Sequence, residues 1–380
     1  MDSRERVVRA IRFEFPDRVP VMHAVLPAGW YRHGADLHAI LRQHPHGLAT
    51  SVDGFGDRAG GGATFGYQAS RDLAELYPIS DDFGYLDARG FQLGPVGAAG
   101  LMRDEWGCIW RKLDPGVVGQ VIDHPLADWS AFERYRWPDP HAYWRYDLPA
   151  LTARVARARR DGKYLVAYAG NVFELMQWLR GYGQLLVDLV ADPSKARALA
   201  ERVAAYCLGT IEEWLRLDGD AIAFNDDWGT QQALMIRPSL WREVFRPLYE
   251  RLFEMVHAAG RHVHFHSDGN TLEILPDLIE LGVEVVNLQL SALDVEKAAR
   301  LIAGRVCLRT DVDRQHVLTR ATPAEVTDYV RRVLDLFGGP RGGVIACGEV
   351  NSDASLANVA AMYEAFERYG RYSKDVAISP

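Results

Sequence analysis

Short apolar runs alternate with longer amphipathic segments through the second half of the chain. The apolar run 164–168 ends at a Gly-Asn pair, and the residues that follow have helical spacing to about residue 190. The succession recurs, with apolar runs at 221–224, 261–266, 283–289, 306–309 and 344–347. Strands that alternate with helices of ten or more residues are typical of a parallel sheet. The pattern therefore predicts at least six βα units after about residue 145.

The number of these units favours a closed barrel. Residues 18–22 can supply an earlier strand, and no Gly-x-Gly-x-x-Gly follows an early strand, as a dinucleotide-binding sheet would require. We expect an α/β protein with a (β/α)8 barrel rather than an open, doubly wound sheet. It should form a single domain over residues 1–380, with an irregular N-terminal elaboration in 1–145 and regular βα repeats in 146–380.

Composition excludes several classes of partner. The chain has 380 residues, with 43 basic and 51 acidic side chains and a net charge of −8, so no nucleic-acid surface is expected. No run of about 18 apolar residues predicts a membrane span, and the charged start lacks the apolar core of a signal peptide. The four cysteines form no Cys-x-x-Cys pair. These features predict a reduced, cytoplasmic protein that acts on a small molecule.

Polar side chains gather where the predicted strands end, which is where barrels of this class place their active sites. They are Asn171, Glu174, Asn225, Asp226, Asp227, His266, Asp268, Asn287, Gln289, Thr310, Asp311, Asp313, Cys347 and Glu349. Arbitrary βα turns would contain more Gly, Ser and Pro. Among these residues we expect Asn171, Asn225 and Gln289 to bind substrate. His23, which follows the first predicted strand, is a fourth candidate for substrate binding.

The segment 262–270 reads His-Val-His-Phe-His-Ser-Asp-Gly-Asn. If its two apolar residues point to one face of a strand, the three histidines point to the other. His266 and Asp268 at the strand end, with Cys347 at the end of the last strand, offer imidazole, carboxylate and thiolate ligands that suit Zn²⁺. The alternative is that the histidines are hydrogen-bonding barrel residues and Cys347 a small buried hydrophobe. We expect scaffold roles for the two earlier histidines.

Three carboxylates are candidate catalytic residues. Asp226 and Asp227 are adjacent at a strand end, where neighbouring side chains point apart, so they are not expected to share one proton. One of them should face the barrel mouth and the other should cap the following helix. Asp311 lies just after a strand, where a carboxylate can face the substrate.

Several of these motifs resemble the uroporphyrinogen decarboxylase superfamily. Residues 3–7 through 16–20 are similar to the usual start of its uncharacterised bacterial members. The segment 225–231 resembles their Asp-Asp-x-Gly-Thr-Gln motif, and 266–270 resembles their His-Ser-Asp-Gly or His-Ser-Cys-Gly turn. The resemblance covers nearly the full chain, and it implies a (β/α)8 barrel that is commonly a homodimer.

The superfamily contains two known chemistries. True uroporphyrinogen decarboxylases use no cofactor and carry a Met-Arg-Gln-Ala-Gly-Arg pattern, whereas Arg18 is followed here by Val-Pro-Val-Met. The resemblance therefore argues against tetrapyrrole decarboxylation. The other branch comprises zinc methyltransferases, whose metal is held by His-x-Cys at one strand end and by a Cys-Gly pair near the last strand. His266 and 347–348 match this pattern, but Asp268 stands where the first Cys would be.

Two functions remain open from the sequence. The first is a zinc-dependent methyltransferase or demethylase that acts on a small molecule or a corrinoid, with a corrinoid protein as a possible partner. In it, His266, Asp268 and Cys347 would hold the metal. The second is a metal-free decarboxylase or other lyase, in which strand-end carboxylates stabilise a developing cation and a histidine protonates the carbanion. A barrel that only binds a partner protein fits the polar strand ends least well.

Overall fold

The computed structural model describes residues 1–22, 24–43, 67–69, 73–76, 100–113, 119–142 and 144–372. His23, a predicted substrate-binding residue, lies outside the described residues. Among the residues that are described, no helix is long and apolar enough to cross a membrane.

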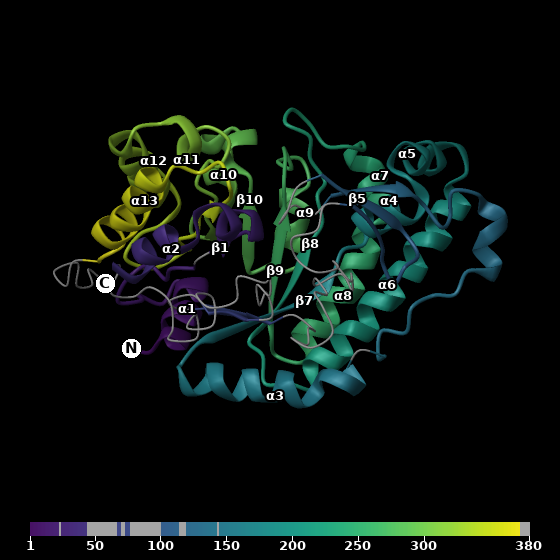
Figure 1. Ribbon diagram of the computed structural model, residues 1–380, viewed down its shortest axis with the longest axis horizontal. Helices are drawn as coiled ribbons and strands as arrows, with labels where there is room; N and C mark the ends of the chain where they lie inside the picture. The colour runs from purple at the N-terminus through teal and green to yellow at the C-terminus, as the bar shows by residue number, and fades with distance from the viewer. Residues whose placement is uncertain are drawn as a thin grey trace.

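A parallel sheet forms the centre of the molecule (Figure 1). Its strands follow one another in chain order and are β7 (Tyr164–Gly170), β8 (Ala221–Asn225), β9 (His262–Ser267), β10 (Val285–Leu288), β11 (Cys307–Arg309) and β12 (Val344–Ile345). On the other side of β7 lies the parallel strand β3 (Leu73–Leu76), to which β2 (Tyr67–Ala69) pairs in the antiparallel sense. The Val, Ile, Leu, Phe and Tyr residues of β7 to β12 are buried, as expected where helices cover the outer face of a parallel sheet.

The amino-terminal part of the chain adds the next parallel pair. Strand β1 (Ala24–Val25) pairs with β13 (Glu349–Val350), and Val21 forms a parallel bridge with Ala346, just after β12. The first and last parts of the chain thus lie side by side. The α/β barrel predicted from the apolar periodicity is confirmed.

Helices surround these strands. They are α1 (Ser3–Arg12), α2 (Pro27–Gln43), α3 (Trp144–Arg160), α4 (Phe173–Arg180), α5 (Tyr182–Ala191), α6 (Pro193–Leu215), α7 (Pro238–Val244), α8 (Arg246–Ala258), α9 (Leu275–Glu280), α10 (Val295–Ile302), α11 (Val317–Arg320), α12 (Pro323–Phe337) and α13 (Leu356–Tyr369). In Figure 1, α4 to α8 lie to the right of β7, β8 and β9, and α10 to α13 lie to the left with α1 and α2.

Two predicted helices are each divided in two. The helix expected from 238 to 259 breaks between α7 and α8, because Pro247 in the first turn of α8 has no amide hydrogen and restricts the residue before it. The helix expected to reach residue 190 breaks at Gly181, whose φ of 89° is outside the helical range. The capping box predicted at Thr322 and Glu325 is confirmed at the start of α12.

A small antiparallel sheet lies outside the barrel. It consists of β4 (Gly100–Arg103), β5 (Ile109–Lys112) and β6 (Gln120–Asp123). Trp110 of this sheet contacts Trp178 of α4 edge to face at 5.4 Å between ring centroids. The amide of Leu126 donates to the carbonyl of Leu179 at 2.9 Å. The sheet thereby extends the side of the molecule formed by α4.

The apolar interior has two parts, which follow from the alternation of side chains along the strands. The larger part packs the helices against the outer face of the sheet. The smaller part fills the barrel and comprises Val7, Ile11, Met22, Tyr164, Val166, Tyr168, Ala221, Ala223, Val285, Cys307, Ile345 and Cys347. Helix α1 closes the amino-terminal end, where Arg4 donates its amide to Gly162 and Gly343 donates its amide to Ala10.

The two earlier histidines of the 262–270 segment belong to this filling. The hydroxyl of Tyr164 lies 2.7 Å from Nδ1 of His262 and 3.2 Å from Nε2 of His264. Burial lowers the pKa of His262 to about 4 and lowers that of His264 well below its usual value, so both rings are neutral at pH 7. These contacts agree with the scaffold role expected from their position early in the strand.

Candidate active site

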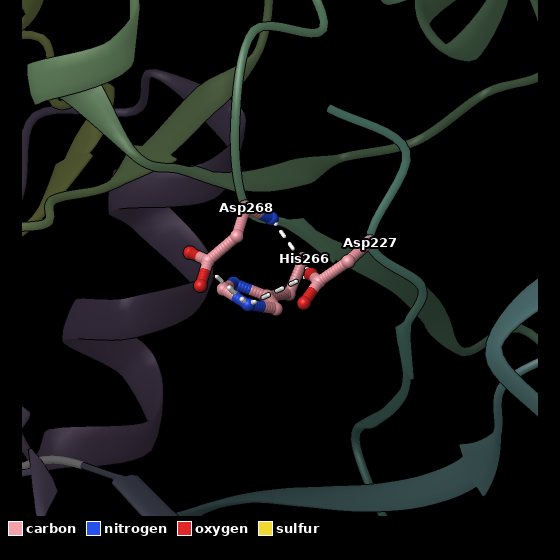
Figure 2. Close-up of side chains that lie close together, drawn as sticks. All are labelled: Asp227, His266 and Asp268. Atoms are coloured by element: carbon pink, nitrogen blue, oxygen red, sulfur yellow. Dashed lines mark hydrogen bonds and ion pairs between the residues drawn. The ribbon is translucent and has the colours of Figure 1, made fainter. Parts of the chain in front are cut away.

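An imidazole and two carboxylates meet at the carboxyl ends of β8 and β9 (Figure 2). Nε2 of His266 lies 3.6 Å from Oδ1 of Asp227 and 3.7 Å from Oδ1 of Asp268. One potential ligand atom from each residue lies within 4.8 Å of the other two. The side chains are 21%, 32% and 29% exposed for His266, Asp227 and Asp268, so a ligand can reach them. We call these three residues the acid–imidazole group.

The strand register explains why His266 reaches this position. Asn225, His266, Asn287 and Arg309 are aligned in one row across β8, β9, β10 and β11. Successive residues alternate across a strand, so members of one row share a face of the sheet. All four therefore point toward the barrel axis near the carboxyl ends of their strands.

The tautomer of His266 is determined by its neighbour Asn287. The amide nitrogen of Asn287 donates to the carbonyl oxygens of Arg309 at 3.0 Å and Thr310 at 3.4 Å. Its Oδ1 accepts from Arg309 at 2.7 Å and lies 2.7 Å from Nδ1 of His266. Because an oxygen can only accept, Nδ1 of His266 carries the hydrogen. In the neutral ring, Nε2 therefore presents its lone pair to the two carboxylates.

Two glycines bring the Asp227 and Asp268 turns together. The backbones of Gly229 and Gly269 are so close that a Cβ built on Gly269 would lie 2.1 Å from the carbonyl oxygen of Gly229. Gly269 also has a φ of 75°, a left-handed backbone conformation that residues with a side chain rarely adopt. The amide of Asp268 donates to Oδ1 of Asp227 at 2.8 Å, which fixes one carboxylate relative to the other turn.

Asp226 lies on the opposite side of the same turn and is fully buried. Its carboxylate accepts from the backbone amides of Val172, Phe173 and Glu174 at 2.8 to 2.9 Å and from the hydroxyl of Tyr249. Burial raises the pKa of Asp226 to about 6, and these hydrogen bonds counteract the rise. Asp226 thus caps α4, which precedes it, rather than the following helix. The predicted catalytic role of Asp226 is corrected to this structural one, because no oxygen is left to face a substrate.

Cys347 is absent from the acid–imidazole group. It is buried in the apolar filling of the barrel. Its amide donates to Oγ1 of Thr310 at 2.7 Å, and its carbonyl accepts from the same hydroxyl at 2.6 Å. The predicted ligand set of His266, Asp268 and Cys347 is therefore corrected at one position. Asp227, which was predicted to be a catalytic carboxylate, completes the group of three candidate ligands in place of Cys347.

A guanidinium that the sequence interpretation overlooked lies beside Asp268. Arg314, five residues after β11, forms an ion pair with Oδ2 of Asp268. It also lies 3.5 Å from Oε1 of Glu349 and 3.8 Å from Oδ1 of Asp311. In the sequence, the position of Arg314 just after Asp311 and Asp313 indicated a pairing with a carboxylate, since buried carboxylates are usually paired with a cation.

Asp311 is buried beneath this guanidinium. Burial raises the pKa of Asp311 to about 8; Arg314 lowers it, while Glu349 and Asp268 raise it further. The pKa of Glu349 is raised as well, again chiefly by burial. Asp311 consequently holds a proton at neutral pH. Among the described residues, its Oδ2 has no hydrogen-bond partner.

The other predicted substrate-binding residues have different surroundings. The amide of Asn171 is buried and donates to Glu174. Oε1 of Gln289 accepts from the amide of Gly269 at 2.8 Å, so this side chain supports the Asp268 turn. Oδ1 of Asn225 has no hydrogen-bond partner within the described part of the chain. Asn225, which is in the same row as His266, is thus the member of this set best able to accept a hydrogen bond from a ligand.

An α/β barrel with acidic and imidazole side chains at its strand ends has the architecture of an enzyme. The model of the family described as "Uroporphyrinogen decarboxylase (URO-D)" matches residues 112–369, and the chain belongs to this family. A uroporphyrinogen decarboxylase of Trichlorobacter lovleyi is 24% identical over 245 residues, which cover 62% of this chain and 68% of the relative. A uroporphyrinogen decarboxylase from an Anaeromyxobacter species is 26% identical over 226 residues, which cover 58% of this chain and 62% of that relative.

A solved structure shares the fold of nearly the whole chain. It is a methyltransferase from Methanosarcina mazei, with a TM-score of 0.63 over 97% of this chain and 99% of that chain. The sequence identity is 14%, so the likeness shows a common fold.

Proposed function

We propose that this protein is a zinc-dependent enzyme that transfers a methyl group to or from a small molecule or a corrinoid. In this proposal His266, Asp227 and Asp268 hold the metal. One observation carries it: Nε2 of His266 lies 3.6 Å from a carboxylate oxygen of Asp227 and 3.7 Å from one of Asp268. In a neutral ring whose Nδ1 carries the hydrogen, the Nε2 lone pair and the two anions would repel one another, and a metal ion between them would remove this repulsion.

The surroundings of the group fit a metal ion. Histidines that bind metals almost always donate their other ring N–H to an oxygen acceptor, and Asn287 accepts that hydrogen from His266. Oδ1 of Asp268 is buried and has no hydrogen-bond partner among the described residues, although it lies 3.7 Å from Nε2 of His266. Both features would be accounted for by an ion that binds this oxygen and Nε2.

The donor set suits zinc with an open position. Zn²⁺ accepts histidine nitrogen and aspartate oxygen, and catalytic zinc sites have three protein ligands plus one substrate or water. One nitrogen and two oxygens form a harder set than thiolates, so Mn²⁺ is a natural competitor. When bound, the metal would lower the pKa of a thiol or water at the open position.

The remaining residues of the site would bind and orient. Asn287 fixes the ring of His266, and the Asp268 amide fixes Asp227. Asp311 holds a proton beside Arg314 at neutral pH, since burial raises its pKa to about 8. Oδ1 of Asn225 would accept a hydrogen bond from the substrate. Methyl transfer is supported by the fold shared with the Methanosarcina mazei methyltransferase, whereas the family description and the sequence relatives are those of decarboxylases.

A metal-free lyase is the second candidate. The contacts of His266 with Asp227 and Asp268 would hold an imidazolium as well as they would hold a metal ligand. A protonated His266 could deliver a proton to a carbanion left by decarboxylation. This reaction would not need an ion between the three side chains.

Zinc content and methyl transfer separate the two candidates. Protein purified without chelators should contain about one zinc per chain. It should transfer a methyl group from methylcobalamin to a simple thiol, and removal of the metal should abolish the transfer. His266→Ala should remove both properties. His257→Ala is the matched control, because His257 lies in the last turn of α8, 3.3 Å from Glu284 and outside the acid–imidazole group.

The opposite result would favour the lyase. Wild-type protein that contains no metal, and that binds none when it is added, would contradict zinc-dependent methyl transfer. Release of CO₂ that persists in a chelator and is lost in Asp227→Asn would support the second candidate.

A further inference from the structure

Arg314 is a cation in direct contact with the acid–imidazole group. Its guanidinium forms an ion pair with Oδ2 of Asp268, while Oδ1 of the same carboxylate faces His266. The same guanidinium lies 3.5 Å from Glu349 and 3.8 Å from Asp311. The Arg314 side chain is 19% exposed, so water screens these contacts only in part.

We propose that Arg314 is a built-in competitor of the metal, which holds Asp268 in the metal-free protein and turns to Glu349 when the ion takes Asp268. This inference rests on the proposed function, because it concerns the same metal site. It assigns to Arg314 the control of metal affinity. Arg314 is thus a positioning residue, which acts on the metal through Asp268.

Electrostatics give the reason for the exchange. A divalent ion bound by His266 and Asp268 would lie close to the guanidinium, and like charges at this distance repel strongly in a partly buried site. Asp268 would share its charge with the ion, so its attraction for Arg314 would fall. Asp268 pairs with Nη2 of Arg314, whereas Glu349 and Asp311 lie within 4 Å of Nη1 already. The guanidinium can therefore change partners by a small rotation of its side chain.

The arrangement also keeps the metal-free protein together. Arg314 contacts Asp268, Asp311 and Glu349 at the same time, so it joins the Asp268 turn to the ends of the last strands. Arginine is well suited to this position because its planar group can contact two carboxylates at once. A protein with Arg314 therefore stays folded before it binds metal, at the cost of weaker binding.

The test measures metal affinity directly. Zn²⁺ is titrated calorimetrically into metal-free, full-length wild type, Arg314→Gln and Arg314→Lys. The control is Arg242→Gln. Arg242 lies on α7, is half-exposed, and forms an ion pair at 3.0 Å with Asp277 of α9. We expect Arg314→Gln to lower the Kd of zinc at least tenfold, since both the competition and the repulsion disappear. Arg314→Lys should lower it by a smaller factor, because lysine keeps the charge but not the two-pronged contact.

A second measurement separates this role from a merely structural one. The melting temperature of metal-free Arg314→Gln should fall below that of wild type, and zinc should raise it by more than it raises that of wild type. If Arg314→Gln does not fold, Arg314→Lys decides by its zinc Kd. Unchanged or weaker zinc binding in the folded variant overturns the inference.

The outcomes distinguish this inference from the proposed function. If wild type binds zinc and the variant binds it no more tightly, only the role of Arg314 is wrong. If wild type and both Arg314 variants bind no metal, the metal site itself is wrong. If the variant binds zinc and wild type does not, the competition is supported in its strongest form.

Discussion

Nδ1 of His266 and Oδ1 of Asn287 lie 2.7 Å apart across neighbouring strands, and this contact determines which ring nitrogen faces Asp227 and Asp268. The amide group of Asn287 cannot turn over, because its nitrogen lies between two backbone carbonyls. A side chain outside the acid–imidazole group thereby prepares His266 to bind a cation.

Asn287→Leu should weaken metal binding about 10- to 100-fold, the usual effect of removing a partner of a ligating histidine. The ring of His266 would lose its preferred tautomer and orientation. Zinc titration of metal-free protein measures the change. Asn358→Leu is the control, because Asn358 is a buried amide whose nitrogen likewise donates to backbone carbonyls, those of Val317, Leu318 and Ala321. Equal losses of zinc affinity in both variants would contradict the role of Asn287.

The neighbours Asp226 and Asp227 should respond in opposite ways to substitution by Asn. Asp226→Asn would replace one of the two oxygens that together accept four hydrogen bonds, three of which cap α4, by an amide group that cannot accept. It should cost about 2–4 kcal/mol of unfolding free energy, as the loss of a buried network does. Asp227→Asn should change this free energy by less than about 1 kcal/mol, since its side chain is partly exposed, but should weaken zinc binding. Urea unfolding and zinc titration of both variants test the assignment, and a reversed order would refute it.

The stability of the metal-free protein should depend on pH through Asp311. Its carboxyl has a pKa of about 8 in the folded protein and near 3.8 when it is exposed. The folded protein therefore binds one more proton than the unfolded chain between these values, so the contribution of Asp311 is fully present below pH 4. It is lost progressively as the pH rises through 8.

Asp311→Asn imitates the protonated carboxyl and removes this dependence. Its unfolding free energy relative to wild type should rise between pH 5 and pH 8 and then level off. Denaturant unfolding at pH 5, 7 and 9 measures the difference. A difference that stays constant over this range would mean that Asp311 is ionised throughout.

The close approach of Gly229 and Gly269 predicts a large effect of one methyl group. Gly269→Ala would place a Cβ 2.1 Å from the Gly229 carbonyl oxygen. Gly304→Ala is the control, because Gly304 has a similar φ of 73°, against 75° for Gly269, with no atom within 4 Å of the added Cβ. We expect about 1 kcal/mol of destabilisation at Gly304, from the backbone conformation alone. Gly269→Ala should cost at least about 2 kcal/mol more, because backbone must move. Similar unfolding free energies for the two variants would mean that the contact is not rigid.

The barrel could be predicted because its signal is local and repeated. Each apolar run between helical segments marks a strand, and the strand ends follow from where the run stops. The same reasoning brought His266 and Asp268 to the correct end of β9. It also gave the scaffold role of the two earlier histidines, whose rings bond Tyr164 inside the barrel.

The parts that could not be predicted depend on contacts between distant segments. Asp226 and Asp227 are identical residues, and only the packing of Tyr249 and α4 shows which one is buried. Cys347 follows a strand end as predicted, but the hydroxyl of Thr310 fixes its backbone while its side chain packs in the barrel. Arg314 follows Asp311 and Asp313, which indicates a nearby carboxylate, but its pairing with Asp268 depends on how two distant turns pack together.

The most direct test of the metal site is X-ray diffraction from crystals grown with zinc, measured above and below the zinc absorption edge. The account predicts one strong anomalous peak per chain, within about 2.2 Å of Nε2 of His266 and of one oxygen each of Asp227 and Asp268. The peak should be missing from crystals of His266→Ala. A peak at Cys347, or no peak among these three side chains in wild-type crystals grown with zinc, would contradict the account.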